Sequence, residues 1–71
     1  MAIQWRVVIS ISQNNRQLAL QKNASDDTLT DLNLLDVNDN VLGGVTLTAS
    51  ELDNLAILTV QAKAIKNLAN A

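Results

Sequence analysis

Carboxylate side chains are the groups of this sequence that most readily suggest chemistry. The 71 residues include seven Asp and Glu residues but no His, Cys or Tyr. An enzyme would therefore have few general bases or nucleophiles to use, and zinc fingers, disulfides and thiol chemistry are excluded. No spacing singles out a catalytic pair of carboxylates, and so short a chain hardly builds the cleft that such a pair needs. The sequence predicts a protein that is not an enzyme and that uses no cofactor.

One cluster of oxygen-bearing side chains has the alternation of a calcium loop. Residues 36–40 read Asp-Val-Asn-Asp-Asn. An EF-hand needs Gly at its sixth position and Glu at its twelfth, whereas Val41 and Leu47 stand there. The cluster is therefore interpreted as an Asx-type turn of a hairpin, with calcium binding as the alternative. Gly43-Gly44 is not a phosphate loop, because no GxxxxGK[ST] pattern surrounds it.

The balance of charge and aromatic residues argues against nucleic acid as a partner. The formal net charge is −2 and Trp5 is the one aromatic residue, so the chain offers neither a basic footprint nor a base-stacking platform. No apolar run approaches the 18 residues of a membrane span. The N-terminus also lacks the basic and then apolar pattern of a signal peptide. The expected partners are proteins, with no nucleic acid and no membrane.

Charge is segregated along the chain. Residues 1–22 carry three bases and no acid, residues 23–53 carry seven acids and no base, and residues 54–71 carry two bases. Blocks of opposite sign attract each other within or between chains. Two interpretations stay open. Either the acids gather in a solvated middle loop, or the basic arm and the acidic middle meet across subunits or on a scaffold.

The first elements that the sequence predicts are a strand and its hairpin partner. Residues 3–12 alternate with the period of a half-buried strand. The positions that point one way are all apolar: Ile3, Trp5, Val7, Ile9 and Ile11. With Asn14-Asn15 as a two-residue loop, Ile11 faces Leu18 and Ile9 faces Leu20. The sequence therefore predicts a β-hairpin of residues 2–12 with 17–22.

The apolar face of this hairpin needs a cover, because an isolated hairpin is marginal in water. Trp5 lies on that face and is interpreted as a core residue, with a partner-binding hot spot as the alternative. Residues 23–31 are expected to form a loop. Two further apolar runs, 32–37 and 41–47, flank a polar triplet and predict a second hairpin of ambiguous register. Gly43-Gly44 in that hairpin indicates a bulge or a close approach of backbones.

The C-terminal residues 48–71 predict a helix. Residues 48–51, Thr-Ala-Ser-Glu, match a capping box with Thr48 as the N-cap and Glu51 reaching back. Acidic residues stand in the first turn, and Lys63 and Lys66 stand near the end, as the helix dipole favours. Residues 1–71 are thus expected to form one small α+β domain: a hairpin arm (1–22), a loop with a second hairpin (23–47) and a helix (48–71).

One stripe of this helix has the 3, 4, 3, 4 spacing of a coiled-coil seam. Its members are Leu55, Leu58, Ala62, Ile65 and Ala69. The preferred interpretation is that the stripe covers the hairpin within one subunit, and the alternative is a helix seam between copies. Trp5 and the five stripe residues are the candidate residues of an interface with a partner.

The size of the chain favours self-association. The unfolded chain exposes about 11,000 Å² and a compact monomer about 4,300 Å². The apolar part of the difference contributes on the order of 100 kcal/mol, while ordering the chain costs about 105 kcal/mol. Small chains commonly offset such a deficit with disulfides, metal or partners. Since the composition excludes disulfides and zinc fingers, association with copies or with a larger structure remains.

Residues 45–55, Val-Thr-Leu-Thr-Ala-Ser-Glu-Leu-Asp-Asn-Leu, resemble a segment of virion proteins of tailed bacteriophages. In head fibres, decoration proteins and tail fibres, a Val-Thr-Leu-Thr-Ala-Ser/Ala-Glu-Leu-Asn-x-Leu stretch often opens a short helix. Residues 35–44 look like the Asp-x-Asn-x-Asn-Val hairpin that often precedes it. Here Asp53-Asn54 replaces a single Asn, and the usual Gly-Val after the Leu is missing. The departure favours a compact capsid accessory protein over a long fibre.

The resemblance implies a non-enzymatic structural role in the virion. Such proteins are commonly trimeric, and they bind at capsid symmetry axes or between capsomers. The chain is therefore expected to be a capsid decoration (cement) or fibre-anchoring subunit, a homotrimer bound to the major capsid protein at the capsid surface and made in the cytoplasm of a bacterial host. The alternative is a soluble oligomeric adaptor or small regulator that binds protein through its helix face.

Overall fold

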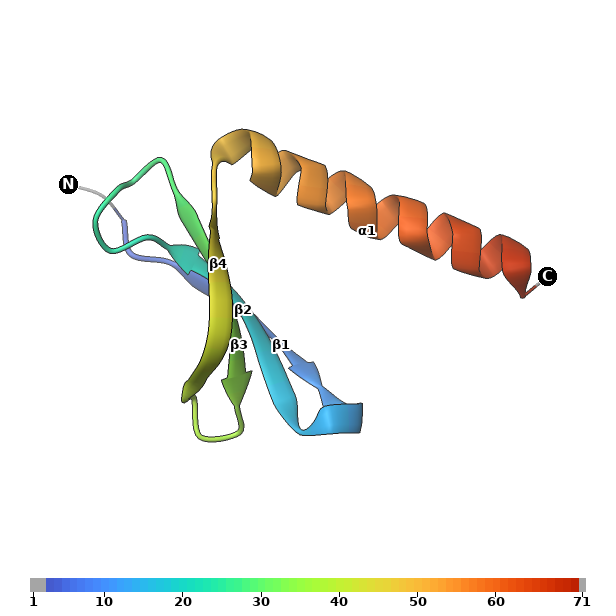
Figure 1. The fold of residues 1–71 in the computed structure, drawn as a ribbon, viewed down its shortest axis with the longest axis horizontal. Helices are drawn as coiled ribbons and strands as arrows, with labels where there is room; N and C mark the ends of the chain where they lie inside the picture. The colour runs from blue at the N-terminus through green and yellow to red at the C-terminus, as the bar shows by residue number, and fades with distance from the viewer. Residues whose placement is uncertain (1–2, 71) are drawn as a thin grey trace.

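A computed structural model of the chain describes residues 3–70 and shows a four-stranded sheet followed by one long helix (Figure 1). The elements in chain order are β1 (Arg6–Ile11), the 3-10 turn η1 (Ser12–Asn14), β2 (Arg16–Lys22), β3 (Thr30–Asp36), β4 (Val41–Leu47) and α1 (Ala49–Ala69). The predicted α+β class with two hairpins and a C-terminal helix is confirmed. Residues 2 and 71, the predicted ends of the first hairpin and of the helix, lie outside the described residues.

The four strands form one antiparallel sheet in the order β1-β2-β3-β4. The two predicted hairpins are joined because β2 also pairs with β3, which sets Leu18 opposite Leu34 and Leu20 opposite Leu32. Aliphatic residues on successive strands therefore lie in rows across the sheet, and cross-strand pairs of this kind stabilise it. This central pairing was not predicted from the sequence.

The register of the first hairpin differs from the prediction by two residues. Ile9 lies opposite Leu18 and Ile11 lies opposite Arg16. The connection is longer than a two-residue loop because η1 occupies Ser12–Asn14, and Asn15 closes the turn in the left-handed region with a φ of 53°. A shift of two residues leaves every side chain on its predicted face, since the side-chain period of a strand is two.

The second hairpin confirms both features expected at the glycine pair. Leu34 lies opposite Gly43 while Leu35 lies opposite Val41, so Leu42 is the extra residue of a bulge. At Gly44 the backbones approach closely, because a Cβ atom there would lie 2.7 Å from the carbonyl oxygen of Leu32. A β-carbon at this position would therefore force the two strands apart.

The two faces of the sheet differ in composition. We define the aliphatic face by the residues at the centre of one side: Val7, Ile9, Leu18, Leu20, Leu32, Leu34 and Val45. Around them on the same side lie Ile11, Arg16, Lys22, Thr30, Asp36, Gly43 and Leu47. The polar face consists of Arg6, Val8, Ser10, Gln17, Ala19, Gln21, Asp31, Asn33, Leu35, Val41, Gly44 and Thr46. The buried apolar residues of the described chain, Ala19 and Leu35, both lie on the polar face. Their cross-strand neighbours are Val8 and Asn33 for Ala19, and Gln17 and Val41 for Leu35.

Helix α1 begins as predicted. The Thr48 hydroxyl accepts a hydrogen bond from the Glu51 amide, and the Glu51 carboxylate accepts one from the Thr48 amide. The helix then extends away from the sheet and contacts it mainly through β4 (Figure 1). The radius of gyration is 14.2 Å, whereas a compact domain of this length has about 11 Å.

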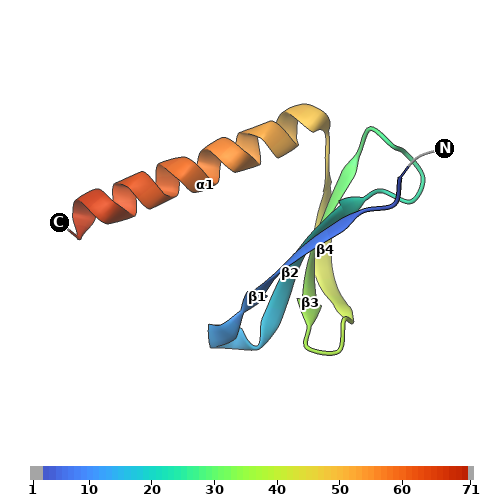
Figure 2. The same cartoon turned by 180° about the vertical axis from the view of Figure 1, so that it is seen from behind.

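The preferred interpretation of the helix stripe, a cover for the hairpin within one subunit, is wrong for most of its length. Leu52 and Leu55 are half-buried, and the rest of the described helix is exposed. In Figures 1 and 2 the β1–β2 hairpin lies on the side toward which α1 extends, but an open angle separates the two. The helix dipole and capping box stabilise α1 locally, so the helix forms without packing along the sheet.

Candidate association surface

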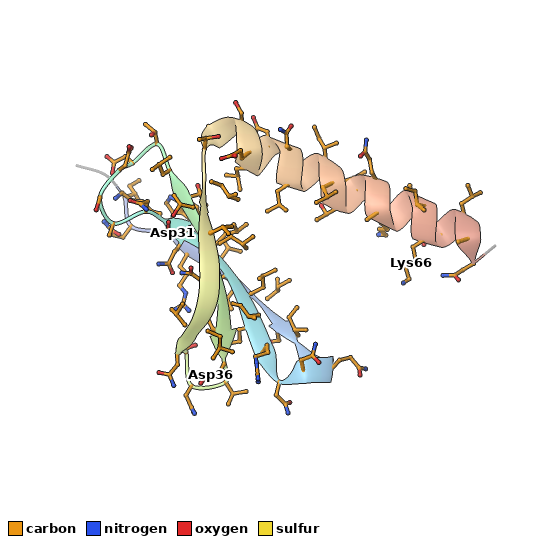
Figure 3. The ribbon with its side chains drawn as sticks, in the orientation of Figure 1. Asp31, Asp36 and Lys66 are labelled. Atoms are coloured by element: carbon orange, nitrogen blue, oxygen red, sulfur yellow. The ribbon has the colours of Figure 1, made fainter. Side chains whose placement is uncertain are left out.

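An apolar groove of about 400 Å³ lies between the aliphatic face and the first half of α1. We define the apolar groove by its lining residues: Val7, Ile9, Leu18, Leu20, Leu32, Leu52, Asp53, Leu55, Ala56 and Thr59. Aliphatic side chains of β1, β2 and β3 form one wall, and the first three turns of α1 form the other. Figure 3 shows side chains of the sheet projecting into the open angle that the groove occupies.

The sheet wall is built by the antiparallel register. Val7, Leu20, Leu32 and Val45 form one row across all four strands, and Ile9, Leu18 and Leu34 form a second row. Val7 and Ile9 on the edge strand keep 61% and 56% of their surface exposed. Large apolar patches that stay exposed in this way usually mark interaction sites.

The helix wall is shaped by small and aliphatic residues. Leu52 and Leu55 point toward the sheet, while Ala56 and Thr59 continue the wall one turn further. The Thr59 hydroxyl donates a hydrogen bond to the carbonyl oxygen of Ala56 at 2.8 Å. Its polar atom is therefore satisfied by the helix backbone. Asp53 is the one charged residue that lines the groove.

The structure brings only one of the predicted interface residues into the apolar groove. Leu55 lines it, whereas Leu58 and Ile65 lie further along α1 with 59% and 69% of their surface exposed. Ala62 and Ala69 are also exposed. The stripe therefore divides into a part that meets the sheet and a part that extends past it.

Trp5 is not a core residue, so that interpretation is wrong. Its side chain keeps 41% of its surface exposed and lines a shallow hollow with Gln4, Arg6, Gln21 and Lys22, away from the apolar groove. Trp5 directly precedes the edge strand β1. The alternative, that Trp5 binds a partner, stays a prediction.

The predicted residues omitted the whole sheet wall of the groove. The alternation of residues 3–12 and the Leu18–Leu20 spacing do indicate an uncovered apolar face, and that signal could have placed Val7, Ile9, Leu18 and Leu20 among the interface residues. Leu32 could not be found in this way, because only the β2–β3 pairing brings it beside Leu20.

The charged residues of the other elements make contacts within the chain. The Lys22 ammonium lies 2.8 Å from the Asp27 carboxylate, and Lys22 is largely buried. The Arg6 guanidinium lies 4.0 Å from Asp39. In these two pairs a base of the N-terminal block meets an acid of the middle block inside one subunit. The acids are therefore not only solvated, and these two contacts do not cross between subunits.

Two of the acidic residues are held as anions by local hydrogen bonds. The backbone and side-chain amides of Asn40, with the backbone amide of Asn38, lower the pKa of Asp36. The hydroxyl and backbone amide of Thr28 lower the pKa of Asp26. These bonds confirm the Asx-type turn at Asp36, whose oxygens are engaged by the loop itself.

Between residues 3 and 70, no group of three or more Asp, Glu, His or Cys side chains is placed to hold a metal ion. Within the described residues, no helix combines the length and the apolar character that a membrane span requires. Comparisons of the chain with known protein families, curated proteins and solved structures give no match.

Proposed function

We propose that the chain is a non-enzymatic structural subunit of a bacteriophage virion, a capsid decoration (cement) or fibre-anchoring protein that works as a homo-oligomer. The observation that carries the proposal is the apolar groove. In a monomer its aliphatic side chains would stay exposed to water, which is unfavourable. The sequence resemblance at residues 45–55 supports the role in a virion. The open groove supports self-association.

The exposed area supports association quantitatively. The chain exposes 5588 Å², whereas a compact monomer of 7.6 kDa exposes about 4,300 Å². The excess of about 1,300 Å² exceeds the roughly 800 Å² that each partner contributes to a standard interface. Association would thus cover surplus exposed surface and stabilise the fold by mass action.

The segment that resembles virion proteins coincides with a structural joint. Residues 45–47 end β4, Thr48 caps the helix, and residues 49–55 form the first turns of α1. This joint sets the angle at which α1 leaves the sheet, and so it sets the width of the apolar groove. The same segment in a fibre or decoration protein would fix how a helix projects from a small β domain.

Two measurements test the proposal. Sedimentation equilibrium of the purified chain at micromolar concentration should give an oligomer, with a trimer expected from the resemblance, and a stable monomer would contradict it. Mass spectrometry of purified phage particles that encode the chain should find it in complete virions together with the major capsid protein. An oligomer that is absent from complete particles would instead support a soluble adaptor.

A further inference from the structure

We infer that the outer half of α1, residues 60–69, lies in the apolar groove of a second copy of this chain. The inference rests on the self-association proposed above and names its contact. It joins two surfaces that one molecule leaves exposed: a groove without an occupant among residues 3–70, and an apolar helix segment that extends beyond its own sheet.

The helix segment suits the groove in composition. Val60, Ile65 and Leu68 keep 69%, 69% and 79% of their surface exposed, although each is a large apolar residue. Ala62 and Ala69 lie on the same segment, and small residues allow a helix to approach its neighbours closely. An amphipathic helix that inserts its apolar residues into a groove is a common mode of recognition.

The two surfaces also match in length. Ten helical residues extend about 15 Å at 1.5 Å per residue. Four strands span three intervals of about 4.8 Å, which is about 14 Å across the sheet. The outer half of α1 can therefore lie across β1 to β4 of a neighbour and cover both rows of the aliphatic face.

Charge favours the same arrangement. Residues 54–70 contain Lys63 and Lys66 and no acid, whereas Asp53 is the one charged residue lining the groove. Lys66 projects from the side of α1 that faces the open angle (Figure 3). With the two helices antiparallel, a register that sets Lys66 near the neighbour's Asp53 also sets Ile65 near Leu55 and Ala62 near Leu58.

A parallel helix seam between copies explains less of the surface. It would cover Leu58 and Ile65 but would leave the exposed Val7 and Ile9 in water. It would also bring the Lys66 side chains of the copies toward one another, and like charges in contact are unfavourable. When the copies exchange the outer halves of α1, the same contact covers the exposed residues of the helix and the aliphatic face of the sheet.

Disulfide trapping tests the contact, because the wild-type chain has no cysteine. Chains carrying Ile9→Cys and chains carrying Ile65→Cys, distinguished by a mass tag, are co-expressed and oxidised. We expect a mixed disulfide between the two kinds of chain and little product from either variant alone. The matched control replaces Ile9→Cys with Val37→Cys, which is also exposed but lies outside the groove.

The outcomes separate this inference from the proposed self-association. If the wild type sediments as an oligomer but Ile65→Cys chains cross-link mainly to themselves, a parallel seam replaces the groove contact while self-association stands. A mixed yield no higher than that of the Val37→Cys control would also overturn the inference. If the wild type is a stable monomer, the proposed self-association fails as well.

Charge reversal provides a second readout. Asp53→Lys and Lys66→Glu should each weaken self-association about tenfold, because each places like charges at the contact. The two changes in one chain should restore the dissociation constant to near the wild-type value. Weakening that adds up in the double variant, with no restoration, would contradict the pairing of Lys66 with Asp53.

Discussion

The two faces of the sheet show opposite ways of treating apolar residues. On the polar face, Ala19 and Leu35 are buried by their neighbours, with 0% and 2% of their surface exposed. On the aliphatic face, Val7, Ile9 and Leu34 remain 61%, 56% and 40% exposed. Both buried apolar residues of the described chain therefore lie on the face with fewer apolar residues, although Val8 and Val41 on that face stay 39% and 62% exposed. The richer face stays open in a single chain, and it is the face on which we propose that a second copy binds.

The reason lies in what stands beside each apolar side chain. Asn23 and Thr46 both donate hydrogen bonds to the Asp31 carboxylate, and Gln17 donates to the carbonyl oxygen of Asp36 and to Asp39. Asp31 and Asp36 lie toward opposite ends of β3 and belong to two separate clusters of these bonds (Figure 3). On this face, single apolar residues stand among polar side chains that bond to one another or to the backbone. A continuous aliphatic surface has no such groups and can be covered only by another apolar layer.

The largest expected effect comes from a matched pair of truncations on β3. Leu35→Ala should lower the free energy of unfolding by about 2–5 kcal/mol, because it removes a fully buried side chain. Leu34→Ala, one residue away on the aliphatic face, should cost clearly less in dilute protein. Chemical denaturation of both variants measures the difference, and equal losses would show that the aliphatic face is already closed within one chain.

A smaller effect is expected at the glycine pair of β4. Gly44→Ala should destabilise the fold by about 1–3 kcal/mol, since its Cβ would crowd Asn33 and the Leu32 carbonyl on the polar face. Gly43→Ala is the control, because nothing lies within 4 Å of its Cβ position. We expect it to be neutral or slightly stabilising. Thermal melts of the two variants should therefore separate, and a reversed order would disprove the close approach at Gly44.

A polar substitution on the edge of the aliphatic face should act on association more than on the monomer. Ile9→Thr keeps β-branching, so it should change the unfolding free energy of dilute protein by less than about 0.5 kcal/mol. At high concentration its melting temperature should rise less with concentration than that of the wild type, because fewer apolar contacts form between copies. Melts over a hundredfold range of concentration measure this, with Val37→Thr as the exposed control.

The smallest effect concerns pH. Because the pKa of Asp36 is lowered from its ordinary value of 3.8 by the amides of Asn40 and Asn38, its carboxylate stabilises the fold above that value. The stabilisation is lost as the pH falls through the lowered pKa. Asp36→Asn retains an acceptor oxygen but does not titrate, so melts between about pH 4 and pH 2 should show a shallower decline. An unchanged decline would assign the acid sensitivity to other carboxylates.

Local features of the fold were predictable from particular residues. The Thr48 and Glu51 capping box, the turn at Asp36 and the bulge beside Gly43 each depend on neighbours a few positions away, and the structure confirms all three. The interface prediction was less complete. Spacing along α1 identified Leu55, but it missed Leu32, which reaches the apolar groove only through strand pairing.

The errors arose where several arrangements satisfy the same pattern. A shift of two residues in the β1–β2 register keeps all side chains on their faces, so alternation could not choose between the expected register and the observed one. The length of the loop decided it, through η1 and Asn15. In the same way, the stripe on α1 is equally apolar whether it meets its own sheet or another chain.

The amino-acid sequence alone determined which side chains share a face, where the helix begins, and that no disulfide forms within these 71 residues. These features depend on residue type and on short-range spacing. Only the tertiary structure decided that the two hairpins merge through β2 and β3 and that α1 leaves the sheet after three turns. Those outcomes depend on competition between long-range contacts of similar energy. The spacing of residues along the sequence is the same for each competing arrangement, so it cannot predict which one forms.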